Sequence, residues 1–230
     1  MIRGIIFDLG GVLVDLDLEI CRSNFISILG YTKIDEILDA CHQKGIYGSL
    51  EEGRLSEEEF KAEILKDSFP GGTGADVDKC MYSLLASMPT YKAELLKSLA
   101  QDYPLYLLSN NNPIAMRRSV EIFSAYGLDF NTLFKKLFLS YQMKMLKPGA
   151  AIYKEVIGNL EGDPSEYIFI DDSLANVEAA SELGFIALHY VIGDDLVQLV
   201  RSGLASVNES DARVYDAVEL PSGTEIGGQN

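Results

Sequence analysis

Acidic residues dominate the chemistry that this sequence could do. The chain of 230 residues has 35 Asp and Glu against 19 Lys and Arg, only two histidines, His42 and His189, and no tryptophan. A histidine-rich metal centre or a Ser-His-Asp triad would have little to draw on, so we expect carboxylate chemistry. The formal net charge of −16 also argues against nucleic acid or an anionic membrane surface as a partner, since both bind cationic faces.

Six polar side chains lie where apolar runs end or helical stripes begin: Asp8, Ser109, Asn110, Lys147, Asp171 and Asp172. Each one alone is commonly a turn former, a helix cap or a solvated side chain. Ligands of an open α/β sheet bind beyond the carboxyl ends of its strands. The six side chains together therefore indicate one site rather than six unrelated turns.

The acids in this set suit phosphoryl transfer. Asp8 could attack phosphorus as a carboxylate nucleophile and form an aspartyl-phosphate that water later hydrolyses. Because carboxylate and phosphate repel each other, a cation must bridge them, and Mg²⁺ prefers oxygen ligands. We expect Asp172 to bind Mg²⁺, Asp171 to bind it directly or through water, and Asp8 to be the bridging ligand.

The remaining three side chains could bind the phosphoryl group. The Ser109 hydroxyl and the Asn110 amide could each donate a hydrogen bond to its oxygens. Lys147 would supply positive charge against the charge that builds up in the transition state.

Strands and helices alternate over most of the chain. Apolar runs at 5–7, 105–108, 167–170 and 185–188, with a weaker one at 137–139, predict strands buried on both faces. Helical stripes lie between them. This order predicts a doubly wound, parallel, Rossmann-like α/β sheet with right-handed crossovers.

Residues 16–89 interrupt this alternation with one helical pattern after another. Ser56 to Glu59 form a capping box before an amphipathic stretch. We therefore predict a core of residues 1–15 and 90–205, an α-helical cap of residues 16–89, and a largely irregular extension at 206–230. Cys21, Cys41 and Cys80 all fall in the cap and show no disulfide or zinc spacing.

The sequence resembles the haloacid dehalogenase superfamily of aspartate-nucleophile hydrolases. Four motifs stand in the order of that superfamily: Phe7-Asp8-Leu9-Gly10-Gly11-Val12-Leu13, Leu108-Ser109-Asn110, Lys147-Pro148 and Ile170-Asp171-Asp172. The insertion resembles its helical C1 cap, and the first motif is similar to that of small sugar-phosphate phosphatases. The resemblance covers residues 3 to 200 and implies a Mg²⁺-dependent phosphatase acting on a small phosphorylated metabolite.

One position departs from the superfamily pattern. Most of its phosphatases have a second aspartate two residues after the nucleophile as general acid and base, and this chain has Gly10 there. The Gly10 carbonyl can still bind the metal, but it cannot move a proton. Asp15 or Asp17 could take that role, although a position in the linker or at a helix start explains both acids better.

The departure keeps alternatives open. A 2-haloacid dehalogenase-type hydrolase would need no metal and would leave the Asp171-Asp172 pair unexplained. A catalytically weak member that only accepts or binds phosphate, similar to a response-regulator receiver, would not need the long cap. The absence of an acid at Gly10 also argues against a phosphomutase.

The cap is expected to carry substrate selectivity and to move. We predict hinges near residues 15–17 and 88–90, and Tyr47 as a packing residue rather than a specificity residue. No apolar run is long enough for a membrane span, and the N-terminus lacks a signal-peptide pattern. These features predict a cytoplasmic protein, and the sequence carries no signal for its oligomeric state.

Overall fold

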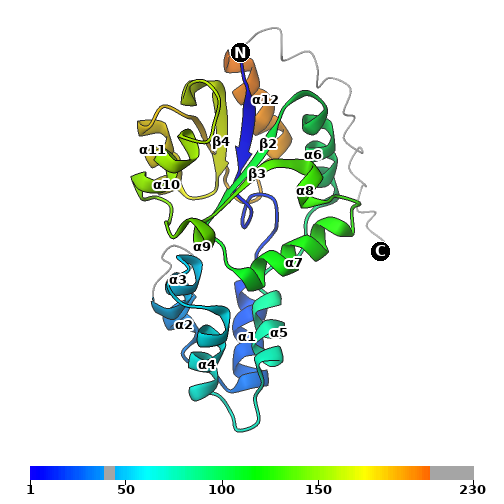
Figure 1. Cartoon of the computed structure of the whole chain (residues 1–230). Coiled ribbons are helices and arrows are strands. Elements are labelled where there is room, and N and C mark those ends of the chain that lie inside the picture. Colours follow the sequence, from blue (N-terminus) through cyan, green and yellow to red (C-terminus); the bar gives the residue numbers. More distant parts are fainter. Residues whose placement is uncertain (39–44, 208–230) are drawn as a thin grey trace, which may run out of the picture.

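The computed structural model describes residues 1–38 and 45–207. Figure 1 shows a sheet flanked by helices and, at one end of it, a separate group of helices. The sheet comes from both ends of the described chain, whereas the separate group comes from one continuous segment. This arrangement is that of an α/β core with a helical insertion.

The core sheet has five parallel strands in the order β3-β2-β1-β4-β5. Their bounds are β1 Gly4–Phe7, β2 Leu105–Ser109, β3 Phe134–Leu139, β4 Tyr167–Asp171 and β5 Ile186–His189. All five strands were predicted, including the weak β3, and the doubly wound parallel fold is confirmed. The chain order reverses between β1 and β4, where binding sites of such sheets form.

Alternate residues of the central strands point into two different cores. Ile5 and Phe7 belong to one hydrophobic cluster, whereas Ile6 belongs to another on the opposite face. The first cluster includes α6 (Thr90–Asp102), α7 (Pro113–Ser124) and α12 (Leu196–Val207), and the second includes α10 (Ala150–Ile157) and α11 (Leu174–Glu182). Burial on both faces explains why the strands are continuous apolar runs.

Three short turns of helix complete the core. They are α8 (Phe130–Leu133), α9 (Ser140–Met143) and the 3₁₀ turn η1 (Pro164–Glu166). α9 begins directly after β3, so it lies at the carboxyl edge of the sheet.

The inserted helices form a hydrophobic core of their own. They are α1 (Leu18–Leu29), α2 (Ile34–Ile37), α3 (Gly45–Glu51), α4 (Glu57–Lys66) and α5 (Gly74–Tyr82). Phe25, Phe60 and Val77 are fully buried among them. The predicted capping box opens α4, with Ser56 and Glu59 exchanging two hydrogen bonds. Cys21 and Cys80 are buried free thiols, and Cys41 lies outside the described residues.

The two segments that join the cap to the core run side by side. The Asp15 N–H donates to the Ser87 carbonyl at 2.8 Å, and the Ala86 N–H donates to the Asp15 carbonyl at 2.9 Å. Leu16 and Leu85 form an antiparallel bridge next to these hydrogen bonds, and the Asp17 N–H donates to the Leu84 carbonyl at 2.8 Å on its other side. The first predicted hinge falls within this pair, and the second falls just after it.

The C-terminal part of the core ends in a helix that the sequence pattern did not identify. Helix α12 continues to Val207, so residues 206–207 are helical rather than irregular. The rest of the predicted extension, 208–230, lies outside the described residues. Within the described part of the chain, no helix is both long and apolar enough to cross a membrane.

Candidate active site

Three charged side chains meet at the carboxyl edge of the sheet where the strand order reverses. Asp8 follows β1, Asp171 ends β4, and Lys147 reaches in from the loop before α10. The Lys147 Nζ atom lies 3.0 Å from Asp8 Oδ1 and 2.6 Å from Asp171 Oδ2. Burial alone would lower the pKa of Lys147, but the two carboxylates raise it, so the lysine stays charged in this buried position.

Asp171 holds the lysine in place. Its Oδ2 accepts from Lys147, while its Oδ1 accepts from the Ser173 N–H and from Asn176 Nδ2, both at 2.9 Å. Both oxygens are thus engaged by protein donors. This disfavours direct metal ligation by Asp171, which the sequence had left open, and gives the residue a positioning role.

Asp172 reaches the site because residue 11 has no side chain. Gly11 has φ +81°, and a Cβ built on it would lie 2.1 Å from Asp172 Oδ2. A larger residue would be strained and would displace the carboxylate. Gly11 therefore permits the approach of Asp172 to the loop that follows β1.

The three acids form a cluster that could hold a metal ion, with Asp8 and Asp172 as direct ligands and Asp171 acting through water. One carboxylate oxygen of Asp8, Asp171 and Asp172 each lies within 4.8 Å of the others. Burial raises the pKa of Asp8 to about 7. The positive charge of Lys147 lowers this pKa, and the negative charges of Asp171 and Asp172 raise it further. Burial and Asp171 likewise raise the pKa of Asp172. One lysine does not balance three carboxylates, and this oxygen-rich, electron-rich set fits Mg²⁺.

Ser109 and Asn110 reach the same edge from the end of β2. Ser109 is buried, with its hydroxyl 3.4 Å from the Asn110 carbonyl. The Asn110 side chain forms two hydrogen bonds with the backbone of Lys147, donating to its carbonyl at 3.0 Å and accepting from its N–H at 2.9 Å. The side-chain amide of Asn110 thus fixes the lysine loop, a role that sequence reasoning missed.

A turn of the cap also lies against this edge. The Ser140 hydroxyl, at the start of α9, donates to the Glu51 carbonyl at 2.6 Å and accepts from the Asn111 N–H at 2.8 Å. A Cβ on Gly53 would lie 2.1 Å from the Tyr141 carbonyl oxygen, which shows how closely the two backbones approach. The end of α3 is therefore held directly beside the loop that follows Ser109.

Glu51 is the residue that sequence reasoning missed. Its side chain is only 3% exposed, and its Oε2 atom has no hydrogen-bond partner in the described structure. Burial raises the pKa of Glu51 to about 8; the hydrogen bond to Tyr47 and the charge of Lys147 lower it, while the charge of Asp8 raises it further. A carboxyl with this pKa is mostly protonated at neutral pH.

A weak signal for Glu51 was present in the sequence. Tyr47 and Leu50 mark the buried face of α3, and Glu51 lies one turn after Tyr47 on that same face. Tyr47 is itself buried and packs edge-on against Phe60, with ring centroids 6.4 Å apart. This contact agrees with the predicted packing role of Tyr47.

The two acids considered as replacements for a side chain at Gly10 are both engaged elsewhere. Asp15 accepts a hydrogen bond at 2.9 Å from Lys92, which is buried. Asp17 caps α1 by accepting from the Ile20 N–H at 2.8 Å. These contacts support the linker and helix-start interpretation of both residues.

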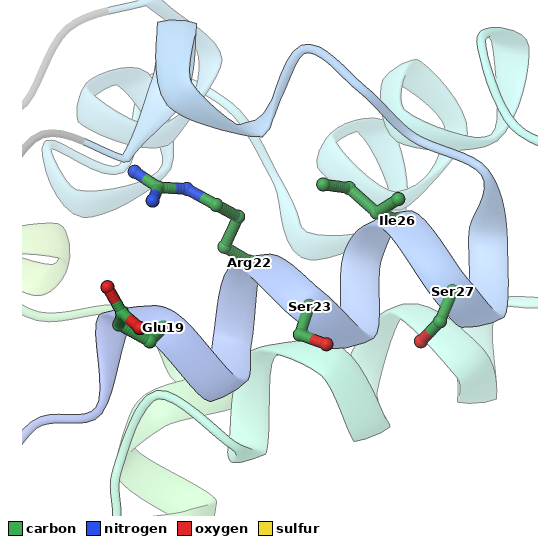
Figure 2. Close-up of a pocket in the computed structure, with 5 residues that line it drawn as sticks. All are labelled: Glu19, Arg22, Ser23, Ile26 and Ser27. Atoms are coloured by element: carbon green, nitrogen blue, oxygen red, sulfur yellow. The ribbon is translucent and has the colours of Figure 1, made fainter.

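A hollow of about 350 Å³ lies away from this site, along α1. Figure 2 shows its lining side chains along one helix: Glu19, Arg22, Ser23, Ile26 and Ser27. Arg22 is paired with Asp35 at 2.6 Å. The hollow contains none of the predicted site residues.

Known proteins are similar to this chain in both sequence and fold. Residues 2–184 match the family model of haloacid dehalogenase-like hydrolases. The chain is 36% identical over 186 residues to a D-ribitol-5-phosphate phosphatase of Bacteroides thetaiotaomicron, covering 80% of this chain and 90% of that protein. It is 28% identical over 173 residues to flavin mononucleotide hydrolase 1 of Arabidopsis thaliana, covering 69% of this chain and 62% of that protein.

A crystal structure gives a similar match. The wild-type form of a haloacid dehalogenase family enzyme from Bacteroides thetaiotaomicron, in complex with magnesium and inorganic phosphate, superposes with a TM-score of 0.80. The two chains are 36% identical, and the match covers 86% of this chain and 99% of the other.

Proposed function

This chain belongs to the haloacid dehalogenase-like hydrolase family, and we propose that it is a Mg²⁺-dependent phosphatase in which Asp8 is the nucleophile. The observation that carries the proposal is the charge imbalance at the buried site. Three carboxylates share one lysine there, and a phosphate ester would add further negative charge. Such a site needs a divalent cation before it can bind its substrate.

Each residue has a place in the reaction. Asp8, Asp172 and the Gly10 carbonyl would hold Mg²⁺, which supplies charge neutralisation and orients the phosphoryl oxygens when bound. Lys147, kept charged and fixed by Asp171 and Asn110, stabilises the equatorial oxygens of the transferring group. Ser109 donates its hydroxyl to the same group. Asp8 then carries the phosphoryl group until water hydrolyses it.

The proposed substrate is the phosphate ester of a small polyol. The relative from Bacteroides thetaiotaomicron is named for D-ribitol 5-phosphate, and the one from Arabidopsis thaliana for flavin mononucleotide. Both compounds carry their phosphate at the end of a ribityl chain. We therefore place a terminal phosphate on an open-chain polyol first among the candidates, with cyclic sugar phosphates next.

A panel of phosphorylated metabolites tests the proposal. It would include D-ribitol 5-phosphate, flavin mononucleotide and several aldose phosphates, each assayed for phosphate release with Mg²⁺ or with EDTA. We expect Mg²⁺-dependent release that is fastest on a ribityl 5-phosphate. Asp8→Asn should lower turnover by at least about 10³-fold because the nucleophile is lost.

Three outcomes would contradict the proposal. Turnover that survives EDTA would favour the dehalogenase-type alternative, in which aspartate attacks carbon without a metal. Turnover that survives Asp8→Asn would remove the nucleophile. An aspartyl-phosphate that persists for minutes in the wild-type protein would indicate a phospho-acceptor rather than a phosphatase.

A further inference from the structure

The proposed phosphatase reaction needs a proton donor, and the nucleophile loop does not supply one. The leaving group of a polyol phosphate is an alkoxide, which must be protonated as the phosphorus–oxygen bond breaks. Gly10 offers only backbone at the position two residues after Asp8. Asp15 and Asp17 are occupied by Lys92 and by the start of α1.

The cap brings one carboxyl to the site from the opposite side. The last residue of α3, Glu51, is tied through its carbonyl to Ser140, and Ser140 is tied to Asn111, two residues after Ser109. This contact places the end of α3 beside the carboxyl edge of the sheet, next to the loop that follows β2. Glu51, Asp8 and Lys147 are all buried, and the charges of Asp8 and Lys147 influence the pKa of the Glu51 carboxyl.

The burial and hydrogen bonding of the Glu51 carboxyl are those expected of a general acid. It is nine-tenths or more buried, and its Oε2 atom has no partner in the described residues, although a buried carboxyl oxygen normally finds one. A hydrogen bond with the Tyr47 side chain acts on the same group and lowers its pKa, against the effect of burial. The titratable groups that act on it are Tyr47 from its own helix, Asp8 from β1 and Lys147 from the loop before α10.

We propose that Glu51 is the general acid and base of this enzyme and does the work that the side chain at position 10 does elsewhere in the family. The inference rests on the proposed phosphatase function. It adds a catalytic residue contributed by the cap, and it explains why a carboxyl is buried there without a cation of its own.

The proton balance closes over the two half-reactions. In the first, an Asp8 oxygen forms a bond to phosphorus while the bond to the ester oxygen breaks, and that oxygen takes the proton of Glu51 to leave as an alcohol. In the second, water attacks phosphorus and gives a proton to the Glu51 carboxylate. The bond between phosphorus and Asp8 then breaks, and its electron pair returns to the aspartate.

Leaving-group dependence tests this role. In Glu51→Gln, kcat/KM for ribitol 5-phosphate or another alkyl phosphate should fall by about 10² to 10⁴, the usual worth of a positioned acid. For an aryl phosphate such as p-nitrophenyl phosphate, whose leaving group needs no proton, the fall should be less than about tenfold. The loss of activity toward alkaline pH should also disappear from the profile of the variant.

Two further variants sharpen the test. Glu52→Gln is the matched control, because Glu52 is the adjacent acid but pairs with Arg54 at the surface, and it should leave both rates unchanged. Gly10→Asp in the Glu51→Gln background should restore part of the alkyl phosphate rate. The three atoms nearest to a Cβ on Gly10 all belong to the Leu16 side chain, at 3.4 Å or more, so the aspartate can be accommodated.

The outcomes separate this inference from the proposed function. If the wild-type enzyme hydrolyses no phosphate ester with Mg²⁺, both fail. If it does, an equal loss on alkyl and aryl substrates in Glu51→Gln, or a change in KM alone, overturns the proton-donor role. A measurement without variants applies even if Glu51→Gln does not fold: wild-type enzyme that strongly prefers aryl over alkyl leaving groups has no general acid, and the inference is then wrong.

Discussion

Two of the contacts between the cap and the core treat a glutamate in opposite ways. The inner contact consists of Glu51, Gly53, Asn111, Ser140 and Tyr141, beside the catalytic edge. The outer contact consists of Glu57 and Lys61 of α4, Asp78 of α5 and Arg117 of α7. Arg117 forms two hydrogen bonds to Glu57 at 2.7 Å, and Lys61 lies 2.6 Å from Glu57 and 2.7 Å from Asp78.

The two glutamates differ in balance and burial. In the outer contact, two acids meet two cations near the surface, and the hydrogen bonds from Arg117 hold the pKa of Glu57 down to about 2. In the inner contact, burial raises the pKa of Glu51 to about 8, and among the described residues no ion pair to its carboxyl is formed. The carboxylate of Glu57 is fully ion-paired. The carboxyl of Glu51 is neutral, and its Oε2 atom has no hydrogen-bond partner among the described residues. The comparison separates a structural attachment from a functional one.

The largest effect should come from removing the cation of the buried site. Lys147→Met leaves the buried carboxylates Asp8 and Asp171 without a counter-charge, and we expect a loss of about 3–5 kcal/mol of unfolding free energy. Arg117→Met, the matched change in the outer contact, should cost less than about 1 kcal/mol, because its side chain is 45% exposed. Urea denaturation in EDTA measures both. Equal losses would mean that burial does not distinguish the two regions.

A smaller effect should come from adding the missing positive charge. Mg²⁺ at a hundred times its dissociation constant should stabilise the wild-type protein by about 2.7 kcal/mol, because it binds the folded site only. Asp172→Asn should abolish most of this stabilisation, and Glu57→Gln should leave it intact. Thermal denaturation with increasing Mg²⁺ gives the shift in Tm. A full shift in Asp172→Asn would remove Asp172 from the metal site.

The smallest effect concerns the pH dependence of stability, where the two glutamates should have opposite signs. Glu51 has a folded pKa above its ordinary 4.5, so the native state holds more protons than the unfolded state and stability falls as pH rises from about 4.5 to about 8. Glu57 has a folded pKa below 4.5, so its stabilisation is complete above that pH and is lost as pH falls toward about 2.

Each slope should become shallower when its residue is replaced. Glu51→Gln should reduce the slope in the neutral range, where the raised pKa of Asp8 also contributes, and Glu57→Gln should reduce it in the acid range, by a few degrees of Tm in each case. The measurement is Tm from pH 2 to 9 in EDTA, for both variants and the wild-type protein. Slopes of the same sign would show that the two contacts share one electrostatic character.

The sequence was most informative where function depends on strand ends. Asp8, Ser109 and Asp171 follow apolar runs that can only be buried strands, and parallel strands bring their carboxyl ends to one edge. The site could therefore be predicted from local patterns and one topological rule. The same reasoning anticipated that Asp17 belongs to the start of a helix.

The cap turn was beyond such reasoning. In the sequence, Glu51 and Glu52 are two adjacent acids before a glycine, and only the spacing of one helical turn from Tyr47 weakly separates the buried one from the one that pairs with Arg54. The difference arises only when Ser140 and Asn111 fold against the end of α3. The roles of Asn110 and Asp171 in fixing Lys147 were likewise invisible, because each depends on which of several possible donors lies within reach.

The paired linkers have a consequence for the timing of each turnover. Asp15 and Ala86 hydrogen-bond across the junction, so the cap is attached by a two-stranded ribbon, and a ribbon bends across its flat face more easily than within its plane. We expect one rotation to dominate, and that rotation carries Glu51 away as it uncovers Asp8. An open enzyme would then hold its nucleophile without its acid. Substrate entry and product exit would then occur only in an inactive state, and the rotation of the cap alone would control whether the reaction can proceed.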